Sequence, residues 1–268
     1  MDLEGKRVLL SGATGGLGRA IAEELAGHGA KLVLSSRRKD ELQQLARSLP
    51  GGARRHEAIV ADLAESGAAE KLARDAGDVD VLIANAALPA TGKLESFSSR
   101  DLERALRVNF ESPIAMARAL APELERKGQG HIVFISSLSG KVSSPRSSVY
   151  NATKFGLRGF SFALREDLHP HGVGVSVVSP GFVSEAGMFH DSGSKAPPGL
   201  GSTTPKKVAR AVTRAIERNR NEITVAPRRF RFVTEVGYRH PEWAARLQRR
   251  GGAERIAEKL AEGQADKR

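Results

Sequence analysis

Seven short runs of β-branched and other apolar residues recur along the first 227 residues of this chain, and each is followed by a polar residue or a proline. Segments with the 3.6-residue periodicity of amphipathic helices lie between them. Strands that alternate with helices favour a parallel sheet covered by helices on both faces. We therefore predict one doubly wound parallel α/β domain over residues 1–227. The expected strands are 7–10, 31–35, 58–61, 79–84, 131–135, 173–178 and 222–226.

A glycine-rich turn joins the first predicted strand to the first predicted helix, with glycines at the spacing G-x-x-x-G-x-G. Glycines let the backbone turn sharply and approach a pyrophosphate closely, and the N-terminus of the following helix attracts an anion. A plain glycine-rich loop is the alternative, but the strand before and the helix after favour a dinucleotide site. The expected contacts to the dinucleotide are Gly12, Thr14, Gly15, Gly16, Leu17 and Gly18.

The end of the second predicted strand indicates which dinucleotide is bound. NAD-specific folds place an Asp or Glu there for the ribose hydroxyls, whereas this chain has Ser36, Arg37 and Arg38. A guanidinium suits a 2′-phosphate because it is planar, permanently charged and a multiple donor. The pattern favours NADP(H) over NAD(H), although these arginines could also simply begin a solvated helix.

A polar group follows the fifth predicted strand. Ser137 lies just beyond residues 131–135, and Tyr150 and Lys154 are four residues apart at the start of a helical segment. Residues at i and i+4 share a helix face, so the phenol and the ammonium project into the same space. We expect the lysine charge to lower the tyrosine pKa, which would make Tyr150 a useful proton donor and acceptor. An ordinary helix-surface pair is the alternative.

Together these motifs resemble the short-chain dehydrogenase/reductase family, in its shorter single-domain branch, over roughly residues 5 to 226. Asn85-Ala86-Ala87, Asn109 and Pro180-Gly181 complete the family's order and spacing, with Ala87 where the family usually has glycine. The resemblance implies a Rossmann fold and an NADP(H)-dependent oxidoreductase that interconverts a ketone or aldehyde and an alcohol. A non-catalytic dinucleotide-binding protein on the same fold is the alternative.

The resemblance also implies roles for single residues. The catalytic set would be Asn109, Ser137, Tyr150 and Lys154, with Asn109 in an irregular helix holding a water that links to Lys154. A buried asparagine satisfied by backbone is the alternative for Asn109. Further cofactor contacts would come from Asp62, Leu63, Asn85, Ala86, Ala87, Tyr150, Lys154, Pro180, Gly181 and Val183. Asp62 could equally cap a helix that starts near Glu65.

Composition limits the remaining possibilities. The chain has no cysteine, which excludes disulfides and thiolate metal sites, and we expect no metal. Its first residues lack the layout of a signal peptide, so a cytoplasmic protein is expected. Apolar faces within residues 114–124 and 155–168 resemble the helices that pair across the family's dimer axis, so a homodimer or homotetramer is expected. Buried helices of a monomer would give the same pattern.

Residues 228–268 form a basic amphipathic extension outside the family pattern. Most of the net charge of +11 comes from residues 206–268, which hold 17 Lys and Arg against 8 Asp and Glu. The extension interleaves aromatic residues with arginines, so it is too apolar for a disordered polar tail. It lacks a recognised nucleic-acid module, and we expect no nucleic-acid partner. It could pack on its own subunit or a neighbour, contact an anionic membrane peripherally, or fray.

Overall fold

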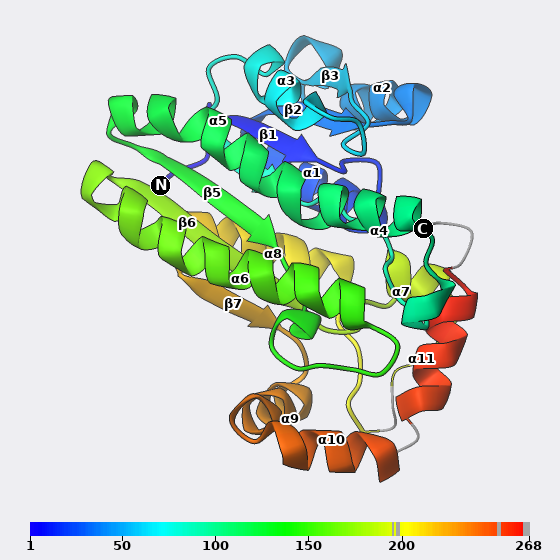
Figure 1. Cartoon of the computed structure of the whole chain (residues 1–268). Coiled ribbons are helices and arrows are strands. Elements are labelled where there is room, and N and C mark those ends of the chain that lie inside the picture. Colours follow the sequence, from blue (N-terminus) through cyan, green and yellow to red (C-terminus); the bar gives the residue numbers. More distant parts are fainter. Residues whose placement is uncertain (195, 197–198, 251–252, 265–268) are drawn as a thin grey trace.

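The computed structural model describes residues 1–194, 196, 199–250 and 253–264, and its centre is a seven-stranded sheet (Figure 1). The strand order is β3-β2-β1-β4-β5-β6-β7, and every neighbouring pair is parallel. The strands are β1 (Arg7–Ser11), β2 (Lys31–Ser36), β3 (Glu57–Val60), β4 (Val81–Ala84), β5 (Gly130–Ile135), β6 (Val173–Pro180) and β7 (Glu222–Val225). The direction of winding reverses between β1 and β4, and such folds bind ligands in the crevice at that point. All seven predicted strands are therefore present.

Helices cover both faces of the sheet and enclose two apolar cores. One core lies under α1 (Gly16–Gly27), α2 (Lys39–Ser48) and α8 (Pro205–Glu217). The other lies under α3 (Ala68–Asp75), α5 (Ser112–Lys127) and α6 (Ser148–Leu168), and Figure 1 shows α5 and α6 on the viewer's side of the sheet, with β5 visible between them. The central strands β4, β5 and β6 are buried along their whole length, which explains their continuous apolar sequence.

Short helical turns connect these elements on both sides of the sheet. They are η1 (Gly52–Arg54), η2 (Leu94–Ser96), η4 (Leu138–Gly140), η5 (His169–His171) and α7 (Met188–Asp191). A five-residue π-helical turn, η3 (Arg107–Glu111), separates α4 (Ser99–Leu106) from α5. The predicted irregularity at Asn109 is therefore present.

The starts of α8 and α3 differ in how they are capped. The Thr204 side chain caps α8, where it accepts a hydrogen bond from the Lys207 N–H, and Pro205 follows in the first turn. The predicted cap at Asp62 is wrong, because α3 begins only at Ala68, after Gly67 in a left-handed conformation. The Asp62 carboxylate instead accepts a hydrogen bond from the Ala64 N–H at 3.0 Å, which closes a local turn.

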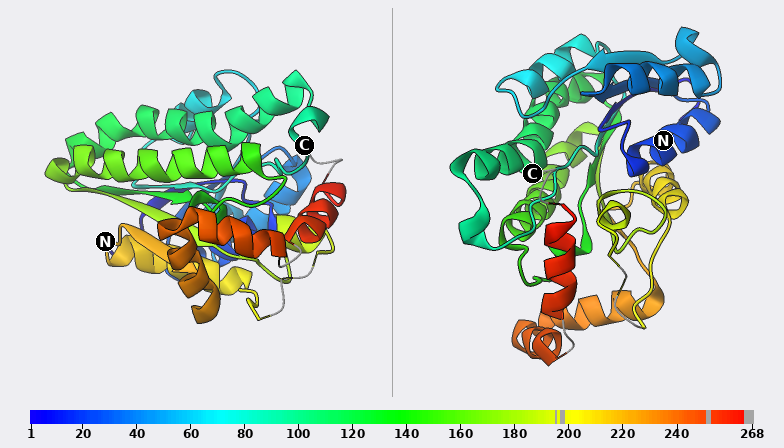
Figure 2. Two further views of the ribbon diagram at one scale, coloured as in Figure 1. Left: turned by 60° about the horizontal axis from the view of Figure 1, so that its bottom comes forward. Right: turned by 90° about the vertical axis from the view of Figure 1, so that its right-hand side faces the viewer.

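Within the described residues of the extension lie three helices, α9 (Arg228–Arg239), α10 (Pro241–Arg250) and α11 (Ala253–Glu262). In Figure 1, α9 and α10 lie below the edge strand β7, and α11 turns upward along the carboxyl ends of the strands. The right-hand view of Figure 2 shows α11 between the loop that follows β4 and the segment around α7. No described helix is both long and apolar enough to span a bilayer.

A buried histidine in β5 couples the stability of this sheet to pH. His131 is 2% exposed, and its Nε2 lies 2.8 Å from the Ser176 hydroxyl of β6, which itself donates to the Arg220 carbonyl. Nε2 therefore carries the proton in that contact. Burial, with smaller contributions from Arg165 and the N-terminus, lowers the His131 pKa to about 3. The folded protein holds this ring neutral.

We predict that the buried, neutral His131 lowers the unfolding free energy of the protein as the pH falls. Below about pH 6.5 the unfolded chain binds a proton at His131 that the folded chain excludes, so the stabilisation present above that pH is lost on acidification. His131→Gln should make the fall in unfolding free energy between about pH 6 and 5 smaller by about 1 kcal/mol. Urea unfolding at both pH values measures this, with the exposed His171→Gln as control. An unchanged pH dependence in His131→Gln would contradict the prediction.

Candidate active site

The residues predicted to carry chemistry meet at the carboxyl ends of the central strands. Ser137 follows β5 and begins η4, while Tyr150 and Lys154 occupy the first turns of α6. Close packing fixes this geometry: the Ser136 hydroxyl donates to the Lys154 carbonyl at 3.2 Å. A Cβ at Gly140 would lie 2.7 Å from the same carbonyl oxygen, so only glycine fits there. The sequence pattern did not reveal this requirement at Gly140.

The Tyr150 side chain is partly buried, and its hydroxyl lies beside Ser137. Burial raises the pKa of Tyr150 to about 12, and the hydrogen bond from Ser137 opposes that rise. The Ser137 hydroxyl oxygen also accepts a bond from the Ser139 N–H at 3.1 Å, which fixes its position at the start of η4. The Tyr150 N–H donates to the Ala90 carbonyl, so the loop after β4 is held against the same site.

Lys154 is 2% exposed, and its ammonium donates to the Ile135 carbonyl at the end of β5, at 2.9 Å. Nζ lies 5.7 Å from the centroid of the Tyr150 ring. Burial lowers the pKa of Lys154 to about 8. The expected lowering of the Tyr150 pKa by Lys154 is not found, because burial is the largest effect on the phenol and it raises the pKa.

Asn151 shapes the site from the position next to Tyr150, and the sequence analysis missed it. Its Nδ2 donates to the Ser139 carbonyl at 2.6 Å and to the Val142 carbonyl at 2.9 Å. These bonds hold the turn after Ser137 against the start of α6. The available signal was an amide residue inside the Tyr-x-x-x-Lys motif, because a buried amide needs hydrogen-bond partners.

Asn109 sits in the π-helical turn, fully buried, and pairs with the backbone of Leu88. Its Oδ1 accepts from the Leu88 N–H at 2.6 Å, and its Nδ2 donates to the Leu88 carbonyl at 2.9 Å. The side chain therefore holds the loop after β4 in place. This agrees with the alternative stated for Asn109, a buried asparagine satisfied by backbone.

The glycine turn packs directly on the end of β4. Gly12 has a φ of +66°, and a Cβ there would lie 2.8 Å from the Ala86 Cα. A Cβ at Gly18 would lie 2.1 Å from the Gly12 carbonyl oxygen. Asn85 Nδ2 donates to the carbonyls of Ser11 and Gly12, both at 3.1 Å. The motif therefore brings the backbone of the turn, Ala86 and the start of α1 together.

The remaining residues of the turn lie at the start of α1. Gly15 precedes the helix and provides no side-chain cap, so the first amides of α1 lack a side-chain partner. A Cβ at Gly16 would lie 2.5 Å from the Ala186 Cβ, which shows how closely the chain after β6 approaches the turn. Leu17 packs on the core beneath, and Ala87 is half-buried just before Leu88. These contacts leave an anion-binding helix terminus beside the sheet edge.

Basic side chains surround the turn. Arg38 donates to the carbonyl and hydroxyl oxygens of Thr14, at 2.8 and 3.0 Å, and its N–H bonds the Ser36 hydroxyl. Arg19, which the sequence analysis missed, donates to the same carbonyl at 3.2 Å and pairs with Glu41. Arg19 lies one residue beyond the last glycine of the motif, on the first turn of α1.

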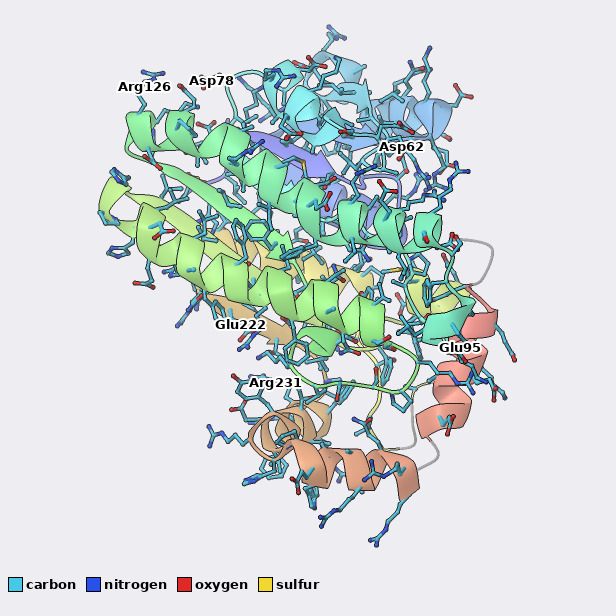
Figure 3. All side chains as sticks on the ribbon, viewed as in Figure 1. Asp62, Asp78, Glu95, Arg126, Glu222 and Arg231 are labelled. Carbon is cyan, nitrogen blue, oxygen red and sulfur yellow. The ribbon has the colours of Figure 1, made fainter. Side chains whose placement is uncertain are left out.

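Arg37 has fewer contacts than the arginines beside it. Half of its side chain is exposed, and its only recorded ion pair among the described residues is a long 3.7 Å contact with Asp62. Asp62 lies near the sheet edge beside β2 and β3, where Figure 3 labels it, and the following Leu63 is buried. The guanidinium of Arg37 therefore remains available to an anionic ligand.

An aromatic cluster lines the end of β6. Phe182 follows Pro180-Gly181, and its ring centroid lies 5.1 Å from that of Phe230 in α9 and 4.6 Å from that of Phe189 in α7. A Cβ at Gly181 would meet Phe230 at 3.1 Å and Leu138 at 3.2 Å, so the cluster reaches the residue next to Ser137. Val183 is buried and bridges to Thr203. The sequence analysis did not connect these three phenylalanines.

The last described residues tie α11 across the edge of the site. Gln264, 4% exposed, accepts from the Thr91 hydroxyl at 2.6 Å and donates to the Met188 carbonyl at 3.0 Å. Arg146 pairs with Glu258 of α11 at 3.1 Å. Gln264 thus links the loop after β4 to α7, and α11 lies across the carboxyl edge as Figure 2 shows. Among the described residues no cluster of side chains could hold a metal ion.

Comparison with known proteins identifies the family. A family model described as short chain dehydrogenase matches residues 6–197. Ketoacyl reductase HetN of Nostoc sp. is 37% identical over 227 residues, which cover 83% of this chain and 79% of HetN. Some other relatives are matched over only 57% of their length. The chain belongs to the short-chain dehydrogenase/reductase family of oxidoreductases, so the predicted family is confirmed.

Solved structures agree with this assignment. A metagenomic short-chain oxidoreductase in complex with NADP is 30% identical with a TM-score of 0.72, over 85% of this chain and 99% of that one. A 3-ketoacyl-(acyl-carrier-protein) reductase from Brucella melitensis, complexed with NADH, is 25% identical with a TM-score of 0.75 over the same shares. The predicted doubly wound fold is confirmed, and relatives of this fold hold either nicotinamide dinucleotide.

We predict that Asn109→Ala destabilises the protein, because it leaves the buried N–H and carbonyl of Leu88 without partners. The expected loss of unfolding free energy is about 2–3 kcal/mol. Denaturant unfolding measures it, with the exposed Asn221→Ala as control. A variant with wild-type stability but no activity would contradict the structural role of the side chain.

Proposed function

We propose that this protein is an NADP(H)-dependent reductase that interconverts a ketone or aldehyde and an alcohol. The observation that carries the proposal is that Ser137, Tyr150 and the buried Lys154 meet at one place: the Tyr150 hydroxyl lies beside Ser137, and the Lys154 ammonium lies 5.7 Å from the Tyr150 ring centroid. The pair lies at the carboxyl edge of the strands, where the glycine turn also lies. A phenol and a hydroxyl that converge in a buried site can both bond one carbonyl oxygen.

The residues present fit a nicotinamide dinucleotide. At Gly12 and Gly18 the packing leaves no room for a side chain, so only backbone faces the expected pyrophosphate position. The first N–H groups of α1, which have no side-chain cap, point towards the same turn. Asp62 and Leu63 would lie beside the adenine, Asn85 to Ala87 along the cofactor, and Pro180, Gly181 and Val183 beside the nicotinamide. The bound cofactor would supply the hydride, while the protein provides position and charge.

The side chains then divide the proton chemistry. Ser137 would hold the substrate oxygen, and Tyr150 would deliver the proton from its hydroxyl as the oxygen gains charge. A Tyr150 pKa of about 12 keeps the phenol protonated at neutral pH, which suits the reductive direction. Lys154, whose ammonium lies near the ring, would stabilise the phenolate that remains and contact the nicotinamide ribose.

The substrate proposed is a lipophilic or acyl-thioester ketone. Phe182, Phe189 and Phe230 form an aromatic wall that reaches Leu138, next to Ser137. Such a wall favours an apolar group beside the reacting carbonyl, because apolar surface gains free energy on burial. The name of HetN, a ketoacyl reductase, is consistent with this class.

We predict that Tyr150→Phe abolishes carbonyl reduction while NADPH still binds. The substitution removes the proton donor and keeps the ring, so the rate should fall by at least about 100-fold. A screen of apolar ketones followed by NADPH absorbance measures turnover, and a fluorescence titration measures binding. The exposed Tyr238→Phe is the matched control. A Tyr150→Phe rate near that of wild type would refute the assignment.

We further predict that Arg37→Ala weakens NADPH binding far more than NADH binding. The lost contact with the 2′-phosphate should cost about 1.5–3 kcal/mol, because charge-assisted hydrogen bonds are the strong ones. Titrating both cofactors into Arg37→Ala and into the exposed control Arg47→Ala gives the comparison. Equal weakening for both cofactors, or tighter binding of NADH by the wild type, would rule out this cofactor choice.

A further inference from the structure

We propose that α9 and α10 form a docking face for an anionic lipid surface. The docking face comprises Arg228, Arg231, Phe232, Trp243, Leu247 and Arg250, all exposed. This proposal is about a binding surface and not about catalysis, so its test does not depend on the proposed reaction.

The apolar side chains of this face are unusually exposed. Phe232 is 71% exposed, Trp243 47% and Leu247 46%. Of the eight large hydrophobic side chains that are exposed among the described residues, three belong to this face. Aromatic and leucine side chains presented beside arginines are typical of helices that lie in a membrane interface.

The charge of the two helices complements an anionic surface. Residues 228–250 contain seven arginines and two glutamates. Both glutamates already pair within their own helix, Glu235 with Arg239 and Glu242 with Arg246. Within the described part of the chain the other five arginines have no recorded carboxylate partner. Figure 3 labels one of them, Arg231, on α9 below β7. A net positive patch near a membrane attracts anionic headgroups.

The opposite sides of the same helices are anchored to the protein. Phe230 stacks on Phe182, and Gln248 donates to the Ser143 carbonyl at 2.8 Å. The Tyr238 ring lies 5.5 Å from the guanidinium of Arg158, which in turn pairs with Glu222. In α10, Trp243 and Leu247 are four residues apart and share a face, while Ala244 and Gln248 share the neighbouring face towards the protein. The docking face is therefore held facing outwards.

A lipid surface fits this face better than a second copy of the chain. A symmetric interface would bring the same arginines towards one another, and like charges at an interface are unfavourable. The apolar side chains protrude between cations, so they can enter the acyl boundary while the guanidinium groups stay at the headgroups. An acidic protein partner would satisfy the charges but leave Phe232 without a defined pocket, and it remains an outcome of the test.

Vesicle binding by the full-length protein tests the proposal. We expect flotation with phosphatidylcholine vesicles that contain about 30 mol % phosphatidylserine, and none with phosphatidylcholine alone. Binding should weaken strongly at about 1 M salt, where the screening length is only about 3 Å. Trp243 is the only tryptophan in the chain, so its emission should shift to the blue when anionic vesicles are added. Tyr150→Phe should bind as wild type does.

Two pairs of variants distinguish binding through the docking face from nonspecific attraction by the protein's positive charge. Replacing Arg228, Arg231, Arg249 and Arg250 with Gln should lower partitioning by at least about 100-fold. The control replaces Lys206, Arg210, Arg214 and Arg218 of the α8 region with Gln, removes the same charge and should retain most of the binding. Phe232→Ser with Trp243→Ser should also lose binding, whereas Leu94→Ser, at an exposed site elsewhere, should not.

Several results would overturn the proposal. These are the absence of a Trp243 shift with anionic vesicles, equal loss of binding in the α8 control, and equal binding to uncharged vesicles. A doubled mass in light scattering that disappears in Phe232→Ser with Trp243→Ser would assign the face to a second copy. Binding to an acidic polypeptide such as polyglutamate without binding to vesicles would assign it to a protein partner.

Discussion

The burial of Lys154 against the end of β5 is the interaction on which the site depends. Its ammonium bonds the Ile135 carbonyl, and its own carbonyl accepts from Ser136, so the start of α6 is joined to β5 at two points. Gly140 allows that approach, and Asn151 fixes the intervening turn. Tyr150 is thereby held on Ser137. The cost of burying both groups raises one pKa and lowers the other, which leaves a neutral phenol at physiological pH.

Much of this arrangement could be predicted from sequence because it follows from local rules. A buried parallel strand leaves an unbroken apolar run, as in β4 and β5, and each ends where a chemically active residue begins. The glycine spacing between β1 and α1 is visible in the sequence because these positions accept no side chain: a Cβ at Gly12 or Gly18 would collide with backbone atoms. Strand number, order of motifs and the convergence of Ser137 with Tyr150 all follow from such patterns.

Other features depend on contacts between distant segments, which no local pattern encodes. The pKa of Tyr150 is set by how much solvent its surroundings exclude, and spacing to Lys154 gives no measure of that. Asn109 pairs with Leu88 across 21 residues, and Gln264 reaches Thr91 across 173. The path of α9 and α10 below β7 and of α11 along the strand ends, with Phe230 beside Gly181, likewise depends on the finished fold. Asp62 does not cap a helix, because α3 begins only at Ala68, and its carboxylate instead accepts from the Ala64 N–H.

The central claim is that burial keeps the Tyr150 phenol protonated until the proton is transferred to the substrate oxygen. The chain has two tyrosines, so Tyr238→Phe leaves Tyr150 as the only one. Titrating the ultraviolet absorbance of that variant in the folded, cofactor-free state reads the Tyr150 pKa directly. The account predicts negligible tyrosinate up to about pH 10, the ordinary pKa of a free phenol. Tyrosinate that forms between about pH 7 and 8 would contradict it, because Lys154 rather than burial would then dominate the site.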